Sequence, residues 1–148
     1  MSHAVVDAKK FDVLMEELLT KEGTFVIDTG ANTFSNLLAY IVENDVIAML
    51  KDSGRTVYVH TIVGGGDTLL DTANGFNSIA VGVSTPIVLW LNPHFGKLKT
   101  DDGKDFDETK VYKNHQDKLS GVVILHARTS STFGDEYQTD EYKKINFC

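Results

Sequence analysis

Apolar side chains along this chain of 148 residues recur at helical spacing in four stretches, with short strand-like runs between them. The helical patterns cover residues 7–21, 33–52, 67–80 and 105–118. Asn44-Asp45 interrupts the second pattern, which predicts one broken helix or two short ones. Asp105, with Glu108 three residues later, is typical of a capping box and marks the start of the fourth helix.

Four shorter runs rich in apolar and β-branched residues predict strands at residues 24–28, 56–63, 86–92 and 121–127. The first run, "TFVID", carries Phe25 and Ile27 on one face and Val26 on the other. Apolar side chains on both faces indicate a central strand of a parallel sheet. Pro86 has no N–H to donate, which fits the first residue of the third strand.

Helices and strands therefore alternate along the chain, which favours an α/β fold with right-handed crossovers. We expect residues 1–148 to form a single α/β domain with a mostly parallel sheet of about four strands and helices on both faces. A chain of this length can remove about two-thirds of its unfolded surface from water, so it needs no disulfide or structural metal. The tail from Thr129 onward is polar and predicts no regular element.

The charge balance excludes some classes of partner. The formal net charge is -7, from 14 basic and 21 acidic residues, and no basic block interrupts it. Such a surface repels phosphate backbones and anionic lipids, so we expect no direct nucleic-acid binding. The apolar run at residues 87–91 is far shorter than the roughly 20 residues that span a bilayer, which predicts no transmembrane segment and a cytoplasmic protein. Cys148 is the only cysteine, which excludes an intrachain disulfide and a cysteine-based zinc site.

The stretch "FVIDTGANTF" at residues 25–34 holds the most informative candidate chemistry. Asp28-Thr29-Gly30 after two apolar residues is the pattern of a retropepsin-like aspartic protease, in which a homodimer pairs the two Asp28 carboxylates. An acid at the end of an apolar strand is also what a nucleotide-binding α/β protein uses to hold magnesium. The strongly helical pattern at residues 33–52 falls where the protease needs short strands, which favours the α/β interpretation. A stand-alone α/β interaction module is the third alternative.

Three segments together resemble one family. They are "VIDTGANTFSNLLAYIVEND", "HTIVGGGDTLLDTANGF", and "VLWLNPHFGKL" followed by "GKDFDETKVY". This combination is similar to the plasmid conjugal-transfer TraL-type proteins, relatives of the ParA/MinD group of deviant Walker ATPases. The resemblance covers most of residues 24–112 and implies a P-loop NTPase-like, Rossmann-like fold.

The resemblance implies roles for five residues near the carboxyl ends of two predicted strands. Asp28 matches the Walker B-like acid that holds a magnesium-bound water in this ATPase group. Asn92 resembles the asparagine that hydrogen-bonds the adenine edge, and Pro93 follows it. Thr29 and Gly30 adjoin the acid and would contribute to the same nucleotide site. From the residues alone, Asp28 also fits a loop-capping acid, and Asn92 also fits an Asx turn before Pro93.

The chain departs from this family at one decisive place. The ATPases need a glycine-rich loop that ends in Gly-Lys-Ser/Thr and cradles the phosphates, and no such motif occurs here. Gly64-Gly65-Gly66 is followed by Asp67, whose carboxylate would repel a phosphate, so we interpret the triple glycine as a strand-to-helix turn. The chain therefore resembles the C-terminal portion of such a protein, either as a truncated piece or as a domain without its catalytic front end.

The missing Gly-Lys-Ser/Thr loop determines what we expect for activity and partners. We expect no cofactor for this chain alone and no ATPase activity, with ATP and magnesium bound only where an upstream P-loop is present. A missing first strand would expose a sheet edge that invites pairing with another copy. The expected partners are a second copy in a homodimer and proteins of a conjugation or partition apparatus.

We interpret the remaining candidate residues as parts of the core or of the solvated surface. His60 lies within a predicted strand, where a hydrogen-bonded core histidine is favoured over a metal ligand. Tyr58 and Trp90 also lie within apolar strands, so we expect both to pack in the core. The acidic run at residues 101–108 is interpreted as a solvated loop and helix start.

Overall fold

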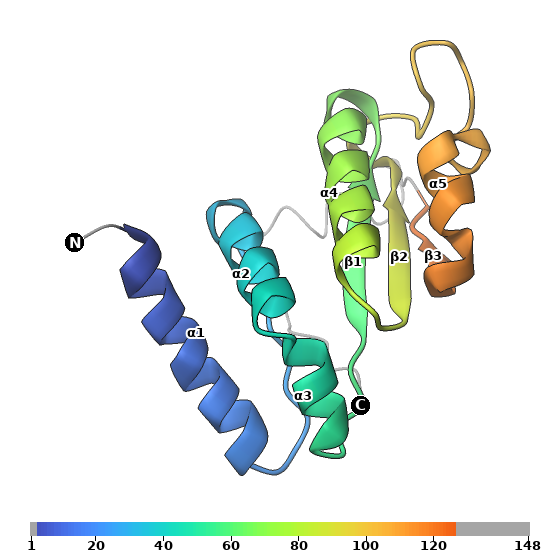
Figure 1. Ribbon diagram of the computed structural model, residues 1–148. Coiled ribbons are helices and arrows are strands. Elements are labelled where there is room, and N and C mark those ends of the chain that lie inside the picture. The colour runs from blue at the N-terminus through green and yellow to red at the C-terminus, as the bar shows by residue number, and fades with distance from the viewer. Residues whose placement is uncertain (1–2, 127–148) are drawn as a thin grey trace, which may run out of the picture.

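The computed structural model describes residues 3–126 and shows an α/β arrangement (Figure 1). Its helices and strands, in chain order, are α1 (His3–Thr20), α2 (Ala31–Glu43), α3 (Val46–Asp52), β1 (Val59–Gly64), α4 (Leu69–Gly82), β2 (Ile87–Asn92), α5 (Lys110–His115) and β3 (Leu119–Ile124). Short 3-10 turns at Gly66–Thr68, Pro93–Phe95, Phe106–Glu108 and Gln116–Lys118 join some of them. The polar tail from Thr129 and Cys148 lie outside the described residues.

The three strands form a parallel sheet in the order β1-β2-β3. In the pairing of β1 with β2, Val59 lies opposite Ile87 and Gly64 lies opposite Asn92. Because the strands are parallel, the loops that follow β1 and β2 emerge at the same edge of the sheet. The predicted α/β class and parallel pairing are confirmed.

The prediction of a strand at residues 24–28 is wrong. These residues form neither helix nor strand, and the described sheet has three strands. Val26 is 91% exposed, while Phe25 is half-buried beneath the Arg55 guanidinium, which lies 5.1 Å from the ring centroid. A strand is held by the backbone groups of a neighbouring strand, and within the described part of the chain none pairs with this segment.

The main core lies between the sheet and α4. Phe76, Ile87, Leu89 and Val63 are the largest fully buried side chains. The Phe76 ring also meets Phe106 edge-on, with a centroid distance of 6.3 Å. Partly buried side chains of α2 add to this cluster, namely Phe34, Leu38 and Ile41. The sheet, α2 and α4 are therefore one packed unit.

The prediction of helices on both faces of the sheet is not met within residues 3–126. Figure 1 shows α4 and α5 on the same side of the sheet. On the opposite face, Ile62 is 56% exposed and His60 is exposed too. Trp90, half-buried beside them, donates its indole N–H to Nδ1 of His60 over 3.1 Å. His60 is thus hydrogen-bonded as expected, but its core placement is wrong, as is that of Tyr58, which is 57% exposed.

A second, smaller cluster joins α1 to α2 and α3. Met15, Leu18, Val46 and Leu50 are buried in it. At its margin the Phe11 and Tyr40 rings lie 5.2 Å apart between centroids, and the Tyr40 hydroxyl donates to the Asp12 carboxylate over 2.6 Å.

The bond from Tyr40 to Asp12 predicts a pH effect. This hydrogen bond to the Asp12 carboxylate raises the pKa of Tyr40 to about 12. Because the neutral hydroxyl makes the bond, its contribution to stability is present below the ordinary tyrosine pKa of about 10 and is lost as the pH rises toward about 12. Ultraviolet titration of the phenolate should show a late component that Tyr40→Phe removes. Asp12→Ala should shift that component down, and an unchanged late component in this variant would contradict the assignment.

Candidate functional site

The candidate site lies at the edge where β1 and β2 end. β1 continues into Gly64-Gly65-Gly66, and β2 continues into Asn92-Pro93. The Gly65 N–H donates to the Asn92 carbonyl over 3.0 Å, and the Gly66 N–H donates to the Lys97 carbonyl over 3.1 Å. In open α/β sheets ligands bind beyond the carboxyl ends of the strands, so this edge is the place to look for a site.

Threonine hydroxyl groups at the start of α4 form hydrogen bonds with the backbone of the triple glycine. Oγ1 of Thr72 accepts the Gly64 N–H over 3.0 Å and donates to the Thr68 carbonyl over 2.6 Å. The Thr68 hydroxyl in turn donates to the Gly65 carbonyl over 2.9 Å. The N–H groups of all three glycines are therefore bonded inside the protein. A phosphate-binding loop needs such N–H groups free to face the ligand, so this loop does not fit a phosphate cradle.

The glycines allow the loop after β1 to pack closely against the loop after β2. A Cβ on Gly65 would lie 1.9 Å from the Gly96 carbonyl oxygen, and one on Gly66 would lie 2.2 Å from the Phe95 carbonyl oxygen. Gly66 and Gly96 also have positive φ angles of 58° and 142°. Backbone therefore packs on backbone here, which supports the interpretation of the triple glycine as a turn.

Asn92 forms an Asx turn. Its Oδ1 accepts the His94 N–H over 3.0 Å, and Pro93 begins the 3-10 turn between them. Its side-chain NH₂ has no hydrogen-bond partner among residues 3–126. Asn92 can therefore still donate a hydrogen bond, although one side-chain acceptor is already used by its own loop.

Asp28, Thr29 and Gly30 lie in the segment before α2 and not at the end of a strand. Asp28 is exposed and Thr29 is half-buried. Gly30 precedes the first helical residue, and its carbonyl accepts the N–H groups of Thr33 and Phe34. Within the part of the chain that the structure describes, no hydrogen bond or ion pair joins these three residues to Asn92 or Pro93.

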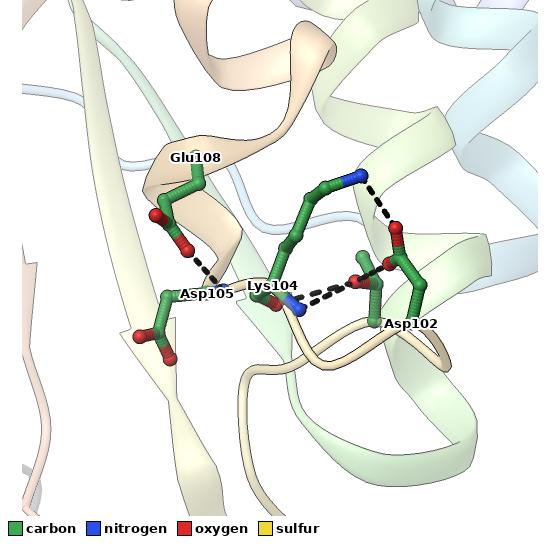
Figure 2. Close-up of polar contacts among 5 residues, drawn as sticks. Asp102, Lys104, Asp105 and Glu108 are labelled. Carbon is green, nitrogen blue, oxygen red and sulfur yellow. Dashed lines mark hydrogen bonds and ion pairs between the residues drawn. The ribbon is translucent and has the colours of Figure 1, made fainter.

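The acidic run forms a self-contained turn (Figure 2). The Lys104 ammonium pairs with Asp102, and the Glu108 carboxylate accepts the Asp105 N–H over 3.0 Å, as the capping box predicted. The Lys104 and Thr100 side chains that bond Asp102 lower the pKa of its carboxyl. Lys99 pairs with Asp105 over 2.7 Å, and this bond raises the pKa of Lys99. The carboxylates of Asp102, Asp105 and Glu108 are thus bonded within the turn, as expected for a solvated loop and helix start.

Other chemistry is sparse in the described region. Residues 3–126 contain no group of three or more His, Cys, Asp or Glu side chains arranged to hold a metal ion. A shallow hollow lined by Val83, Pro86 and Leu119, among others, lies at the amino ends of β2 and β3, away from Asn92. The helices in this same region include none with the length and apolar character to cross a membrane.

Sequence reasoning missed the two threonines that fix the glycine turn. Thr68 and Thr72 lie four residues apart, directly after a glycine run, so their hydroxyls share one face of the helix start. That spacing is the signal that could have found them, because threonine side chains commonly bond nearby backbone groups.

Comparison with known proteins gives two matches of similar strength. One Protein TraL from Escherichia coli is 34% identical over 134 residues, which are 89% of this chain and 55% of that protein. A second Protein TraL from Escherichia coli is 31% identical over 144 residues, which are 96% of this chain and 59% of that protein. No family model matches the chain. No solved structure matches it either.

These matches support the resemblance to TraL-type proteins, while the relation to the ParA/MinD group stays a prediction. The protease alternative gains no support, since α2 and α3 occupy the region where it requires strands. The chain is thus similar over most of its length to the E. coli proteins named TraL, and it spans 55% and 59% of the two relatives it matches.

Proposed function

We propose that this chain is the C-terminal portion of a conjugal-transfer protein of the TraL type with a ParA/MinD-like nucleotide-binding fold, and that by itself it neither hydrolyses ATP nor binds it with useful affinity. The similarity to Protein TraL and the share of those relatives that it spans support the first part. The intact protein is an ATPase only if an upstream P-loop supplies the phosphate site.

The glycine turn is the observation that carries the second part. The three N–H groups that could meet a phosphate donate instead to the Thr72 hydroxyl and to the carbonyls of Asn92 and Lys97. Asp67 follows directly and is exposed, so its charge opposes an approaching phosphate. The residues of this turn do not fit the triphosphate of ATP.

In the intact protein, we assign the nucleotide side of the site to Asn92, Pro93, Thr29 and Gly30. Asn92 stands at the carboxyl end of β2, and its side-chain NH₂ is not bonded to any other residue of 3–126, which suits a donor to an adenine nitrogen. We assign Asp28, which is exposed before α2, to a water-mediated magnesium contact. ATP and magnesium are the cofactors of the intact protein under this proposal.

The proposed setting is cytoplasmic, with proteins of a conjugation or partition apparatus, or a second copy of the chain, as partners. The net charge of -7 continues to argue against direct nucleic-acid binding.

Calorimetry with ATP and magnesium chloride tests the proposal. The chain alone should give no saturable heat, because the N–H groups of its glycine turn are already bonded inside the protein. A longer version with a Gly-Lys-Ser/Thr loop upstream should bind, and Asn92→Ala in that version should weaken the binding. Micromolar ATP binding by the chain alone would overturn the proposal, as would an upstream coding sequence without such a loop.

A further inference from the structure

Phe95 is exposed although its side chain is large and apolar. It is 65% exposed, while the other phenylalanines of residues 3–126 are buried or half-buried. Phe95 belongs to neither hydrophobic cluster of the described region. Among the aromatic rings of that region it meets only His94, edge-on with a centroid distance of 4.8 Å. Packing within the described chain therefore does not account for the position of this ring.

The backbone of the loop that carries Phe95 is held in place. The Gly96 N–H donates to the Pro93 carbonyl over 3.1 Å, and the Lys97 carbonyl accepts the Gly66 N–H over 3.1 Å. A Cβ on Gly66 would lie 2.2 Å from the Phe95 carbonyl oxygen, so the glycine turn packs directly against the backbone of Phe95. Because the backbone is fixed, a ligand that binds the ring has little of the loop to order.

Phe95 and Asn92 lie on one side of the same turn. Asn92 caps the 3-10 turn Pro93–Phe95, and Phe95 is the third residue after it. Side chains three positions apart lie one above the other in such a turn. The Asn92 Oδ1 accepts the His94 N–H, while the Asn92 NH₂ is bonded to no other residue of 3–126. A flat apolar ring and a hydrogen-bond donor therefore lie together at the carboxyl edge of the sheet, where ligands of α/β proteins bind.

We propose that the Phe95 ring is the surface on which the base of the bound nucleotide stacks, while the Asn92 NH₂ donates to a ring nitrogen of the same base. This inference rests on the proposed function, because it concerns the base of that nucleotide. It deepens that function by one residue, since the roles implied by the resemblance do not include Phe95. The phosphates lie outside the inference and stay with the upstream loop.

The chemistry of this pair of side chains favours a purine base. Stacking on the Phe95 ring needs a planar π-system, which every nucleobase offers. The Asn92 NH₂ needs a hydrogen-bond acceptor at the edge of that plane, and both purines present one at N7. The neighbours of Phe95 in the loop, His94 and Gly96, add no aliphatic surface of the kind that an apolar peptide would require. A flat heteroaromatic ligand therefore fits the pair better than an aliphatic one.

The probe is adenosine, titrated into this chain without phosphate or magnesium and followed by proton NMR. The ring current of the stacked base should shift the Phe95 ring protons upfield, and the Asn92 NH₂ protons should move in the same titration. Both shifts should saturate with a dissociation constant of about 1 mM, because one stack and one hydrogen bond are the only contacts. Ribose lacks the base and is the control compound, which should shift neither signal.

Variants of Phe95 separate stacking from simple apolar contact. Phe95→Ala and Phe95→Leu should each weaken adenosine binding about tenfold, because leucine keeps apolar bulk but has no π-face. Phe95→Tyr keeps the ring and should bind as the unmodified chain does. Tyr58→Ala is the matched control, since Tyr58 is 57% exposed and precedes the amino end of β1, at the opposite edge of the sheet. Circular dichroism should be unchanged in all four variants, because both rings are exposed.

Three results would overturn the inference: adenosine leaves the Phe95 signals unmoved, Phe95→Ala binds adenosine as tightly as the unmodified chain, or Tyr58→Ala loses as much affinity as Phe95→Ala. In the longer version with a Gly-Lys-Ser/Thr loop upstream, Phe95→Ala should raise the dissociation constant for ATP about tenfold. Adenosine has no phosphate, so its binding to this chain stands even if the longer version fails to bind ATP. ATP binding that Phe95→Ala leaves unchanged would overturn this inference and leave the proposed function standing.

Discussion

Phe76→Ala is expected to lower the free energy of unfolding by about 3–5 kcal/mol, the usual cost of removing a buried phenylalanine ring. Phe76 is 0% exposed and lies where α4 meets the sheet. Its ring meets Phe106 at 6.3 Å and His115 at 5.9 Å, so the cavity would open between α4 and the segment that carries α5. Since small domains are stable by only about 5–15 kcal/mol, this loss removes a large share of the total stability.

Chemical denaturation followed by circular dichroism measures this loss. Leu70→Ala on the same helix is the matched control, because Leu70 is 72% exposed and its truncation should change stability by about 0.5 kcal/mol or less. Equal losses for the two variants would show that α4 does not bury Phe76 against the sheet.

Gly65→Ala is expected to cost about 3 kcal/mol, at the upper end of the range for overpacking. The added Cβ would lie 1.9 Å from the Gly96 carbonyl oxygen, which is backbone and cannot rotate away as a side chain could. The loop after β1 and the loop after β2 would have to separate, and the bond from the Gly65 N–H to the Asn92 carbonyl would be strained.

Gly121→Ala is the control for the glycine prediction. Gly121 lies within β3, and a Cβ there meets no heavy atom within 4 Å. Thermal unfolding should therefore show a large fall in the midpoint for Gly65→Ala and little change for Gly121→Ala. Comparable midpoints for Gly65→Ala and the unmodified chain would contradict the close contact of the two loops.

The elements that the sequence predicted correctly are those whose signals are local. Apolar spacing located α1 and α4, and the Asn44-Asp45 break separates α2 from α3, with Asp45 in a left-handed conformation at φ 50°. The bond from the Asp105 N–H to Glu108 confirms the capping box, although it begins a 3-10 turn and Thr109 caps α5. Short-range bonds of this kind depend on neighbours in the sequence, which a single chain displays.

The features that the sequence could not predict depend on contacts between residues that are far apart in the sequence. The pattern of "TFVID" is that of a strand, but a strand forms only when it pairs with a neighbouring strand. None of the strands within residues 3–126 pairs with this segment. The same lack of covering elements leaves Tyr58, His60 and Ile62 exposed, although their strand pattern suggested a core. At the candidate site, Asn92 was placed correctly at the end of β2, whereas the bonding of the glycine N–H groups required the fold.

The order β1-β2-β3 follows the order of the strands along the chain. β2 and β3 each pair with the strand that precedes them in synthesis, so no later strand has to be inserted between two earlier ones within the described sheet. β1 and β2 can therefore pair around α4 while α5 and β3 are still on the ribosome, which makes this part of the fold suited to assembly during translation.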